Sequence, residues 1–275
     1  MRAREANPDD WIAIEALIQR AQFDSPALWK WETHLTDRGF IVVEEENRIE
    51  GALFASADES PAAWVRLAAM SAELNVRQWL DLSLPPILDH LRTRGIEQLT
   101  WMDRGGWAAP FLASHGFHTL TEVVTLTKTD HVTPPIETPA VTLRPASQDD
   151  LGAVAAIDRE AFTPTWWRSE ATVRRRAATA SRFTVADRRG DVVGYAEREL
   201  HPPKAHLNRI AVCPDSQGRG IGACLLKHVL VSLWEAGAES VSLNTQRSNR
   251  RSRRLYSTFG FELTGDAVLV WALQL

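Results

Sequence analysis

Residues 206–223 of the 275-residue sequence read HLNRIAVCPDSQGRGIGA. A short apolar run that predicts a β-strand stops at Pro214, and glycines follow at alternate positions, Gly218, Gly220 and Gly222. The glycines lead directly into a long amphipathic segment that predicts a helix. This order favours a site for a phosphate-bearing cofactor, because the first N–H groups of a helix lack intrahelical partners and carry the positive end of its dipole.

The glycine loop alone leaves the class of cofactor open. Glycines remove the Cβ atoms that would keep a phosphate away from the backbone, and Arg219 could add a charge-assisted contact. The dinucleotide-binding pattern requires G-x-G-x-x-G and an acidic residue that closes the second strand, and neither is clean here. The P-loop pattern fails because no Lys-Ser/Thr pair follows the glycines.

A second motif at a suitable distance narrows the choice. Residues 249–261 read NRRSRRLYSTFGF, and residues 217–222 read QGRGIG. These stretches resemble the N-x-x-A/S-x-x-L-Y-x-x-x-G-F segment and the Q/R-x-x-G-x-G/A loop of the GCN5-related N-acetyltransferase (GNAT) superfamily. The resemblance extends over residues 141–275, with the expected helices and strands in the same order as in the superfamily. The motif sequences are most similar to those of the ribosomal-protein N-terminal acetyltransferases.

The resemblance implies that the cofactor is acetyl-CoA, with its pyrophosphate on the loop and its pantetheine arm along the preceding strand. The residues that it assigns to the cofactor are Ile210, Ala211, Val212, Gln217, Gly218, Arg219, Gly220, Ile221, Gly222, Ala223, Asn249 and Ser252. Tyr256 matches the general acid of the family. A phenol with a pKa of about 10 is suited to protonate a departing CoA thiolate.

The general base stays open among several residues. In some relatives a Glu on the splayed strand serves, and His206 falls at about that position here. Histidine has a suitable pKa, about 6.5 in ordinary surroundings. Glu197 and Glu199, which alternate out of the neighbouring strand, are further candidates for the base or for binding a cationic substrate. The nearest relatives carry a Glu where Asn244 stands here, so that base is absent.

The two halves of the sequence repeat one pattern. The matching stretches are Arg4–Trp11 with Arg144–Leu151, Glu50–Phe54 with Val193–Ala196, and Phe111–Phe117 with Leu255–Phe261. Their offsets are 140, 143 and 144 residues, and so steady an offset predicts two copies of one fold.

The predicted organisation is a degenerate GNAT-like domain over 1–130, a Pro-rich linker over 131–140 and a catalytic GNAT domain over 141–275. Residues 77–82 (RQWLDL) stand where the first copy should carry the glycine loop, and Leu112 occupies the tyrosine position. Bulky side chains would close a phosphate site, and a leucine donates no proton. We therefore expect the first copy to lack cofactor binding.

The predicted fold class is α/β, in a layered α+β arrangement. Each domain is expected to hold a mixed, largely antiparallel twisted sheet, flanked by helices, with a splayed central strand pair. In the second half, helices are predicted over 149–162, over 170–180, over the amphipathic segment that follows the glycine loop and ends near 237, and over 248–259. Strands are predicted over 183–186, 192–200, 206–212, 240–245, 261–264 and 268–273.

Composition and charge set limits on the class of protein. The chain is 44% hydrophobic and 24% charged, which is typical of a globular domain, and it has no apolar run of the roughly 20 residues that span a bilayer. Cys213 and Cys224 offer neither a disulfide framework nor metal-ligand spacing. With a polar N-terminus unlike a signal peptide, the expected location is the cytoplasm, and no metal is expected.

The charge is divided unevenly along the chain. Residues 1–139 hold 12 basic against 21 acidic residues, and residues 140–275 hold 19 against 14. The basic second half indicates an anionic ligand, for which the phosphates of CoA suffice. Nucleic acid is not expected, because the arginines of the predicted helices spread around the helix axis.

The function predicted from the sequence is acetyl-CoA-dependent N-acetyl transfer to a primary amine, by direct attack in a ternary complex. The expected partner is a small-molecule or peptide amine, without a membrane, and a homodimer is compatible with the sequence. Two alternatives stay open. One is a non-catalytic acyl-CoA-binding or regulatory module. The other is a small-molecule acetyltransferase similar to the mycothiol synthases, which share only the tandem architecture.

Overall fold

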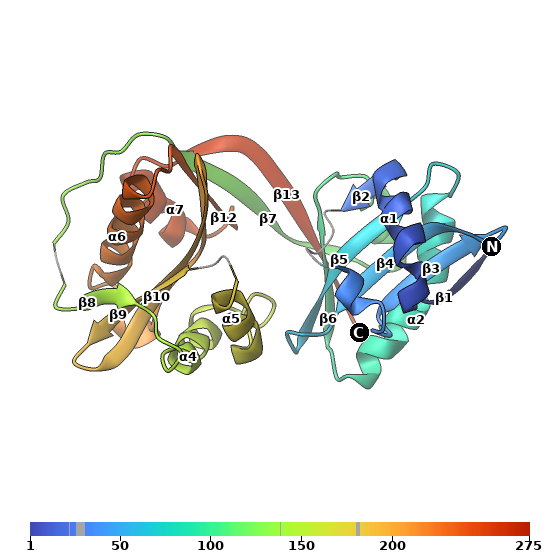
Figure 1. The fold of residues 1–275 in the computed structure, drawn as a ribbon, viewed down its shortest axis with the longest axis horizontal. Coiled ribbons are helices and arrows are strands. Elements are labelled where there is room, and N and C mark those ends of the chain that lie inside the picture. The colour runs from blue at the N-terminus through green and yellow to red at the C-terminus, as the bar shows by residue number, and fades with distance from the viewer. Residues whose placement is uncertain (22, 26–30, 138, 180–181) are drawn as a thin grey trace. The chain divides into compact units, whose positions relative to one another are not determined.

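The computed structural model describes residues 1–275 except 22, 26–30, 138, 180 and 181 (Figure 1). The chain forms two compact units. Unit 1 comprises Met1–Thr121 and Val268–Leu275, and unit 2 comprises Glu122–Ala267. Each unit is a twisted, mostly antiparallel sheet with helices packed against it, which confirms the predicted α/β class. None of the helices in the described part of the chain is long and apolar enough to cross a membrane.

Unit 1 is built on a sheet of six strands in one path, with a seventh at its side. The path runs through β1 (Arg2–Glu5), β3 (Phe40–Glu45), β4 (Arg48–Ser56), β5 (Ala62–Met70), β6 (Gln98–Asp103) and the last part of β13 (Glu262–Gln274), and β2 (Phe23–Ser25) pairs with β5. Its helices are η1 (Pro8–Asp10), α1 (Trp11–Arg20), η2 (Trp31–His34), α2 (Val76–Thr93), α3 (Ala109–Leu112) and η3 (Ala113–His115), where η marks a 3₁₀ helix.

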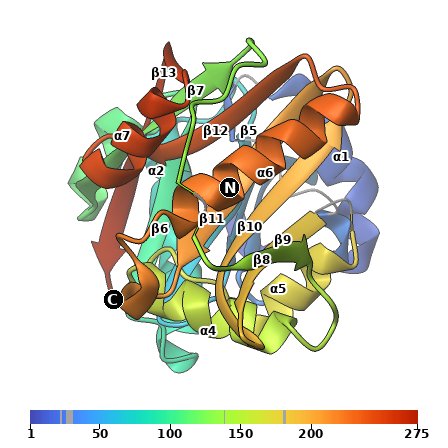
Figure 2. The ribbon, with the colours of Figure 1, turned by 90° about the vertical axis from the view of Figure 1, so that its left-hand side faces the viewer.

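Unit 2 has the same layout. Its strands follow the order β7 (His118–Lys128), β12 (Ser240–Gln246), β11 (Lys204–Val212), β10 (Asp191–His201), β9 (Arg182–Arg188) and β8 (Thr142–Pro145). Its helices are α4 (Leu151–Ala161), α5 (Glu170–Ala177), η4 (Pro214–Ser216), α6 (Ile221–Glu235) and α7 (Arg250–Thr258). Figure 2 looks onto α6, which lies across the strands of this sheet. Separate apolar clusters join α6 and α7 to one face and α4 and α5 to the other.

Two sequence-based boundaries differ from the structure. The strands predicted over 261–264 and 268–273 are one strand in the structure, β13, which begins at Glu262. Gly265 and Asp266 favour a turn, and Gly265 does adopt a positive φ of 92°, but the strand continues through them. The helix predicted over 170–180 ends at Ala177, and its predicted last residue lies outside the described residues.

The sheets do not follow the two halves of the sequence. In unit 1, Leu269–Gln274 at the C-terminus pairs with Gln98–Asp103. In unit 2, Val123–Lys128 from the first half pairs with Val241–Gln246. The predicted domain spans of 1–130 and 141–275 assign both segments differently, because comparing repeats aligns two copies without revealing which sheet a strand joins.

The Pro-rich connector predicted over 131–140 packs along α6. The Lys128 ammonium, which is buried, donates to Asp130 Oδ1 at 2.6 Å, and this lysine holds the pKa of Asp130 below its usual value. The His131 ring stacks on Trp234 of α6 at 5.0 Å between ring centroids, and Ile136 packs against the core of unit 2. Both views show the connector passing over the outer side of α6.

The two units repeat an ion-pair motif as well as a fold. Its members are Arg4, Asp10 and Glu44 in unit 1, and Arg144, Asp150 and Asp187 in unit 2. In each unit the arginine guanidinium grips the first aspartate through both terminal nitrogens, at 2.7 and 2.7 Å in unit 1 and at 2.6 and 2.9 Å in unit 2. The pKa values of Asp10 and Asp150 lie below their usual range, with hydrogen bonds from the arginine as the chief stabilising cause. The offsets of 140 and 143 residues found in the sequence thus recur in the side-chain contacts.

A fragment of residues 1–130 tests the strand assignment of unit 1. It lacks the segment that pairs with β6, including the buried side chains of Val270 and Ala272. Because β6 would be left as an open edge and the core uncovered, we expect no cooperative urea transition in tryptophan fluorescence. Joining residues 268–275 to residue 121 through a flexible linker should restore it. Equal transitions for the two fragments would contradict the assignment.

Candidate functional site

The centre of unit 2 is the point where β11 and β12 separate. Their parallel ladder runs only from Lys204 opposite Ser240 to Leu207 opposite Leu243. Beyond it β12 stays with β7, and β11 stays with β10 as far as Val212. The backbone edge of residues 208–212 on the side of β12 therefore has no ladder partner among the described residues. The predicted cofactor residues 210–212 lie on this edge.

The glycine loop lies at the end of the same strand. Gly218 and Gly220 both have φ of 78°, the left-handed region in which side chains are strained. Gly220 is the N-cap residue of α6, and no side-chain cap hydrogen bond is recorded for it in the described structure. The first intrahelical bond joins Cys224 N–H to Gly220 O at 3.0 Å. The earlier N–H groups of α6 can therefore receive an anion.

The Gln217 side chain braces the loop. Its amide nitrogen donates to Val212 O at 2.9 Å, and its amide oxygen accepts from the Arg251 guanidinium of α7. The loop is thereby held to the end of β11 on one side and to α7 on the other. Both ends of the Gln217 amide therefore bond to protein groups. This predicted cofactor residue supports the site indirectly, by holding the loop in place.

Helix α7 carries the second motif. Asn249 caps it, and its side-chain oxygen accepts from Ser252 N–H at 3.1 Å. The amide nitrogen of Asn249 still carries donors for a ligand. Tyr256 follows on the buried face of the helix, 6% exposed, with its ring edge-on to Phe261 at 5.8 Å. Burial raises the pKa of Tyr256, so that its phenol stays protonated at neutral pH and can act as a proton donor.

His206 contacts Ser242 of β12. Its Nδ1 lies 2.8 Å from the Ser242 hydroxyl oxygen, and the same hydroxyl lies 3.3 Å from Ala205 O. In the tautomer with its hydrogen on Nδ1, His206 donates to this hydroxyl, and Nε2 has the lone pair that a base requires.

The two glutamates of β10 are held in ion pairs. Glu197, expected to alternate out of its strand, is 0% exposed, and its two oxygens are taken by Arg168 and Arg176. Glu199 accepts from Arg176 at 2.9 Å. A carboxylate that receives a guanidinium on each oxygen is poorly placed to take a proton from an amine. This geometry speaks against Glu197 as the base and leaves His206 as the stronger candidate.

A buried polar cluster beside this site was not predicted. It consists of Asp158, Tyr195 and Arg209, with Arg168 at its edge. Two signals were present in the sequence. Arg209 interrupts an apolar strand, and Asp158 falls on the apolar face of a helix beside Ile157.

Unit 1 contains the same strand geometry with its helix end closed. The β5–β6 ladder also stops early, after Trp64 opposite Thr100. Here the N-cap residue is Asn75, whose side-chain oxygen accepts from Arg77 N–H at 3.0 Å and from Gln78 N–H at 3.3 Å. The N–H groups that α6 presents are satisfied in α2 by the chain itself.

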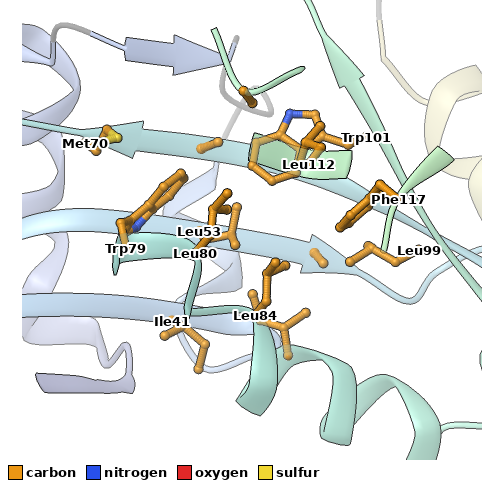
Figure 3. Close-up of a cluster of buried hydrophobic side chains, with 14 of the residues drawn as sticks. Ile41, Leu53, Met70, Trp79, Leu80, Leu84, Leu99, Trp101, Leu112 and Phe117 are labelled. Atoms are coloured by element: carbon orange, nitrogen blue, oxygen red, sulfur yellow. The ribbon is translucent and has the colours of Figure 1, made fainter. Parts of the chain in front are cut away.

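Tryptophans fill the corresponding space in unit 1 (Figure 3). Trp79 of α2 is 0% exposed, and a Cβ on Gly51 would come within 2.6 Å of its ring. Trp101 and Trp107 lie edge-on and tilted to it, with ring centroids 6.4 and 5.8 Å away, and Leu112 belongs to the same core. These rings are thus part of the apolar core of unit 1.

Comparison with known proteins likewise distinguishes unit 2, which carries the glycine loop, from unit 1. The model of the acetyltransferase (GNAT) family matches residues 151–261, which include the glycine loop and Tyr256. A [ribosomal protein bS18]-alanine N-acetyltransferase of Escherichia coli is 30% identical over 112 residues, 41% of this chain and 74% of that protein. A mycothiol acetyltransferase of Acidimicrobium ferrooxidans is 30% identical over 162 residues, 53% of this chain. The match spans about half of the latter protein, 51%.

One solved structure shares the whole architecture. A tandem GNAT protein from the clavulanic acid biosynthesis pathway superposes with a TM-score of 0.63 at 16% identity. The superposition covers 98% of this chain and 94% of that one. The tandem fold predicted from the internal repeat is confirmed.

Two glycine substitutions test the loop with a matched control. Gly220→Ala forces a side chain into positive φ and should cost about 1 kcal/mol of unfolding free energy. It should also weaken CoA binding by about tenfold, because the strain shifts the N–H groups of α6. In the control Gly237→Ala, just past the C-terminal end of α6, φ is 90° and the described structure places nothing within 4 Å of the new Cβ, so a similar loss of stability but no change in CoA binding is expected. Urea unfolding and calorimetric titration measure the two quantities, and an equal loss of CoA affinity in both variants would contradict this account of the loop.

Proposed function

The chain belongs to the GNAT acetyltransferase family, and we propose that unit 2 transfers an acetyl group from acetyl-CoA to a primary amine. The observation that carries the proposal is the conjunction of two features at one place. One is the edge of β11 that has no ladder partner beyond Leu207 among the described residues. The other is the N-terminus of α6, which begins at Ile221 after the N-cap residue Gly220, without a side-chain cap among the described residues. Unit 1 has the first feature without the second.

Acetyl-CoA fits these residues by its chemistry. The N–H groups of 218–223 would hold its pyrophosphate, and the backbone of 210–212 would pair with its pantetheine arm. Asn249 caps α7, and Arg251 of this helix contacts Gln217 of the glycine loop, so both side chains are candidates for further donors to the cofactor. When bound, acetyl-CoA supplies an acetyl thioester that an amine can attack, with a thiolate as the leaving group.

The side chains have complementary tasks in this scheme. Tyr256 holds a proton on its phenol oxygen and would give it to the departing thiolate. His206 would take a proton from the incoming ammonium at Nε2, directly or through water. The proposed attack by the amine on the thioester is direct, without an acyl-enzyme. Cys213, which lies between β11 and the loop, is engaged with another side chain, since its Sγ lies 3.6 Å from a Glu160 carboxylate oxygen.

The amine itself is proposed only by class. The printed names of two relatives suggest the first compounds to try, a peptide that begins with alanine and a thiol-bearing amine such as cysteine amide. Formation of the N-acetylated amine and of CoA from acetyl-CoA, followed by mass spectrometry against a reaction without the protein, would support the proposal. Binding of CoA without turnover of any amine would favour a regulatory module instead.

Tyr256→Phe tests the acid. We expect kcat to fall about 100-fold while the Kd for CoA stays within about twofold, because only the proton donor is removed. The raised pKa of Tyr256 also has a consequence for the wild-type protein. A group that acts when protonated loses activity as the pH rises through its pKa, so kcat should show no tyrosine-dependent decline up to about pH 10. A fully active Tyr256→Phe variant between pH 6 and 9 would remove the assignment.

The stoichiometry of cofactor binding tests the closed state of unit 1. Because Asn75 caps α2 and Trp79 fills the space behind it, we expect one CoA per chain. Isothermal titration of the full chain gives the number directly. Two equivalent sites would show that unit 1 binds the cofactor despite its tryptophans.

A further inference from the structure

One buried carboxylate ties four elements of unit 2 together. Asp158 of α4 is 0% exposed. It accepts from the Arg168 backbone N–H at 2.6 Å, from Arg209 Nη2 at 3.1 Å and from the Tyr195 hydroxyl. These partners come from the segment before α5, from β11 and from β10. The carboxylate therefore fixes the α4–α5 segment against both strands.

Arg209 holds the same segment at two further points. Its Nε lies 2.5 Å from Asp158 Oδ2, and a terminal nitrogen donates to the Trp166 carbonyl oxygen. The guanidinium carbon lies 3.8 Å from the centroid of the Phe162 ring. Arg209 belongs to the separated part of β11, so one residue connects the proposed cofactor strand with residues 162–168.

Glu197 secures the far end of this segment. One of its oxygens receives the Arg168 guanidinium and the other receives Arg176 of α5. Residues 162–169 are thus held by the backbone at Trp166 and Arg168 and by the side chain of Arg168. Trp166 and Trp167 lie within the segment.

The segment covers the face of the sheet opposite α6. Tyr195 belongs to the apolar cluster of α4 and α5, whereas its neighbour Ala196 belongs to the cluster of α6. Since strand residues alternate, Glu197 and Glu199 share the face of Tyr195. His206 lies directly across from Glu199 in the ladder and therefore shares it too. The candidate base and the α4–α5 segment lie on one face.

Unit 1 shows what the fold requires at these positions. Its sheet has the same register, with a shift after Phe54 that matches the shift after Glu197. The register and the 140-residue offset of α1 and α4 pair Ile18 with Asp158, Ala52 with Tyr195, Phe54 with Glu197 and Leu67 with Arg209. Ala52, Phe54 and Leu67 belong to one apolar core cluster of unit 1, and Ile18 packs against it.

The comparison separates architecture from function. The ion pair of Arg4 with Asp10 recurs as Arg144 with Asp150, as expected of a contact that the fold needs. The Asp158 cluster is confined to the unit with the glycine loop. Buried ion pairs seldom add stability over well-packed apolar residues, and unit 1 uses apolar residues in the same place. Stability therefore does not explain the cluster.

We propose that Arg209 is a positioning residue which, through Asp158 and Trp166, holds residues 162–169 in place to bind the amine acceptor. The inference rests on the proposed acetyl transfer at this unit. The proposal gives β11 two roles. Its backbone edge would pair with the cofactor, and the Arg209 side chain would order the segment that binds the amine acceptor.

Arg209→Lys tests the proposal, with Arg144→Lys as the matched control. Lysine keeps the charge but lacks the planar fork that reaches Asp158 and Trp166 together. The assay uses the full chain and the amine that it acetylates, either the alanine peptide or cysteine amide. We expect the KM for this amine to rise about tenfold in Arg209→Lys. The Kd for CoA should stay within about twofold. Arg144→Lys, which alters a similar fork away from the segment, should leave both constants unchanged.

Hydrogen exchange supplies a readout without an acceptor. Amides of 162–169 should exchange about tenfold faster in Arg209→Lys than in the wild type, and Arg144→Lys should not change them. An unchanged KM together with unchanged exchange in Arg209→Lys would overturn the proposal, as would an equal rise of KM in Arg144→Lys. Faster exchange without turnover of any amine would contradict the proposed function while supporting the contact of Arg209 with the segment.

Discussion

The early end of the ladder between β11 and β12 is the constraint on which the site depends. After Leu207 and Leu243, each strand stays with its other neighbour, and the backbone edge of β11 loses its partner. The chain then turns through glycines into α6, whose first N–H groups have no side-chain cap in the described structure. Backbone groups from a strand and from a helix thus become available at one place, and the side chains of α7 and α4 complete it.

The internal copy shows which features belong to the fold and which to the chemistry. Both units retain the shortened parallel ladder and the arginine–aspartate fork. Only unit 2 combines a glycine N-cap with a buried polar cluster, whereas unit 1 has Asn75 as its cap and Trp79 in its core. The two units thus keep one strand order while they differ in the side chains at these positions.

The residues predicted for the cofactor side were chosen from local signals in the sequence. Glycines at positive φ, an apolar strand before them and a tyrosine on a short helix all act within a few residues of one another. Contacts between distant segments could not be predicted in this way. The pairing of Glu197 with Arg168 and Arg176, and of Arg209 with the Trp166 carbonyl, depends on side-chain packing across 21 to 43 residues. For this reason Glu197, which was expected to alternate out of its strand, is buried in the structure, and Glu199 is partly buried.

The exchange of closing strands between the halves has a genetic consequence. After a duplication, a copy without its own chemistry is ordinarily free to be lost. Here the copy without a glycine loop leads into Val123–Lys128, which lies beside β12 of the other unit. The copy with the loop, in turn, supplies Leu269–Gln274 to β6. Neither half can be deleted without removing a strand from the other, so selection that keeps one sheet intact also preserves the other half of the chain.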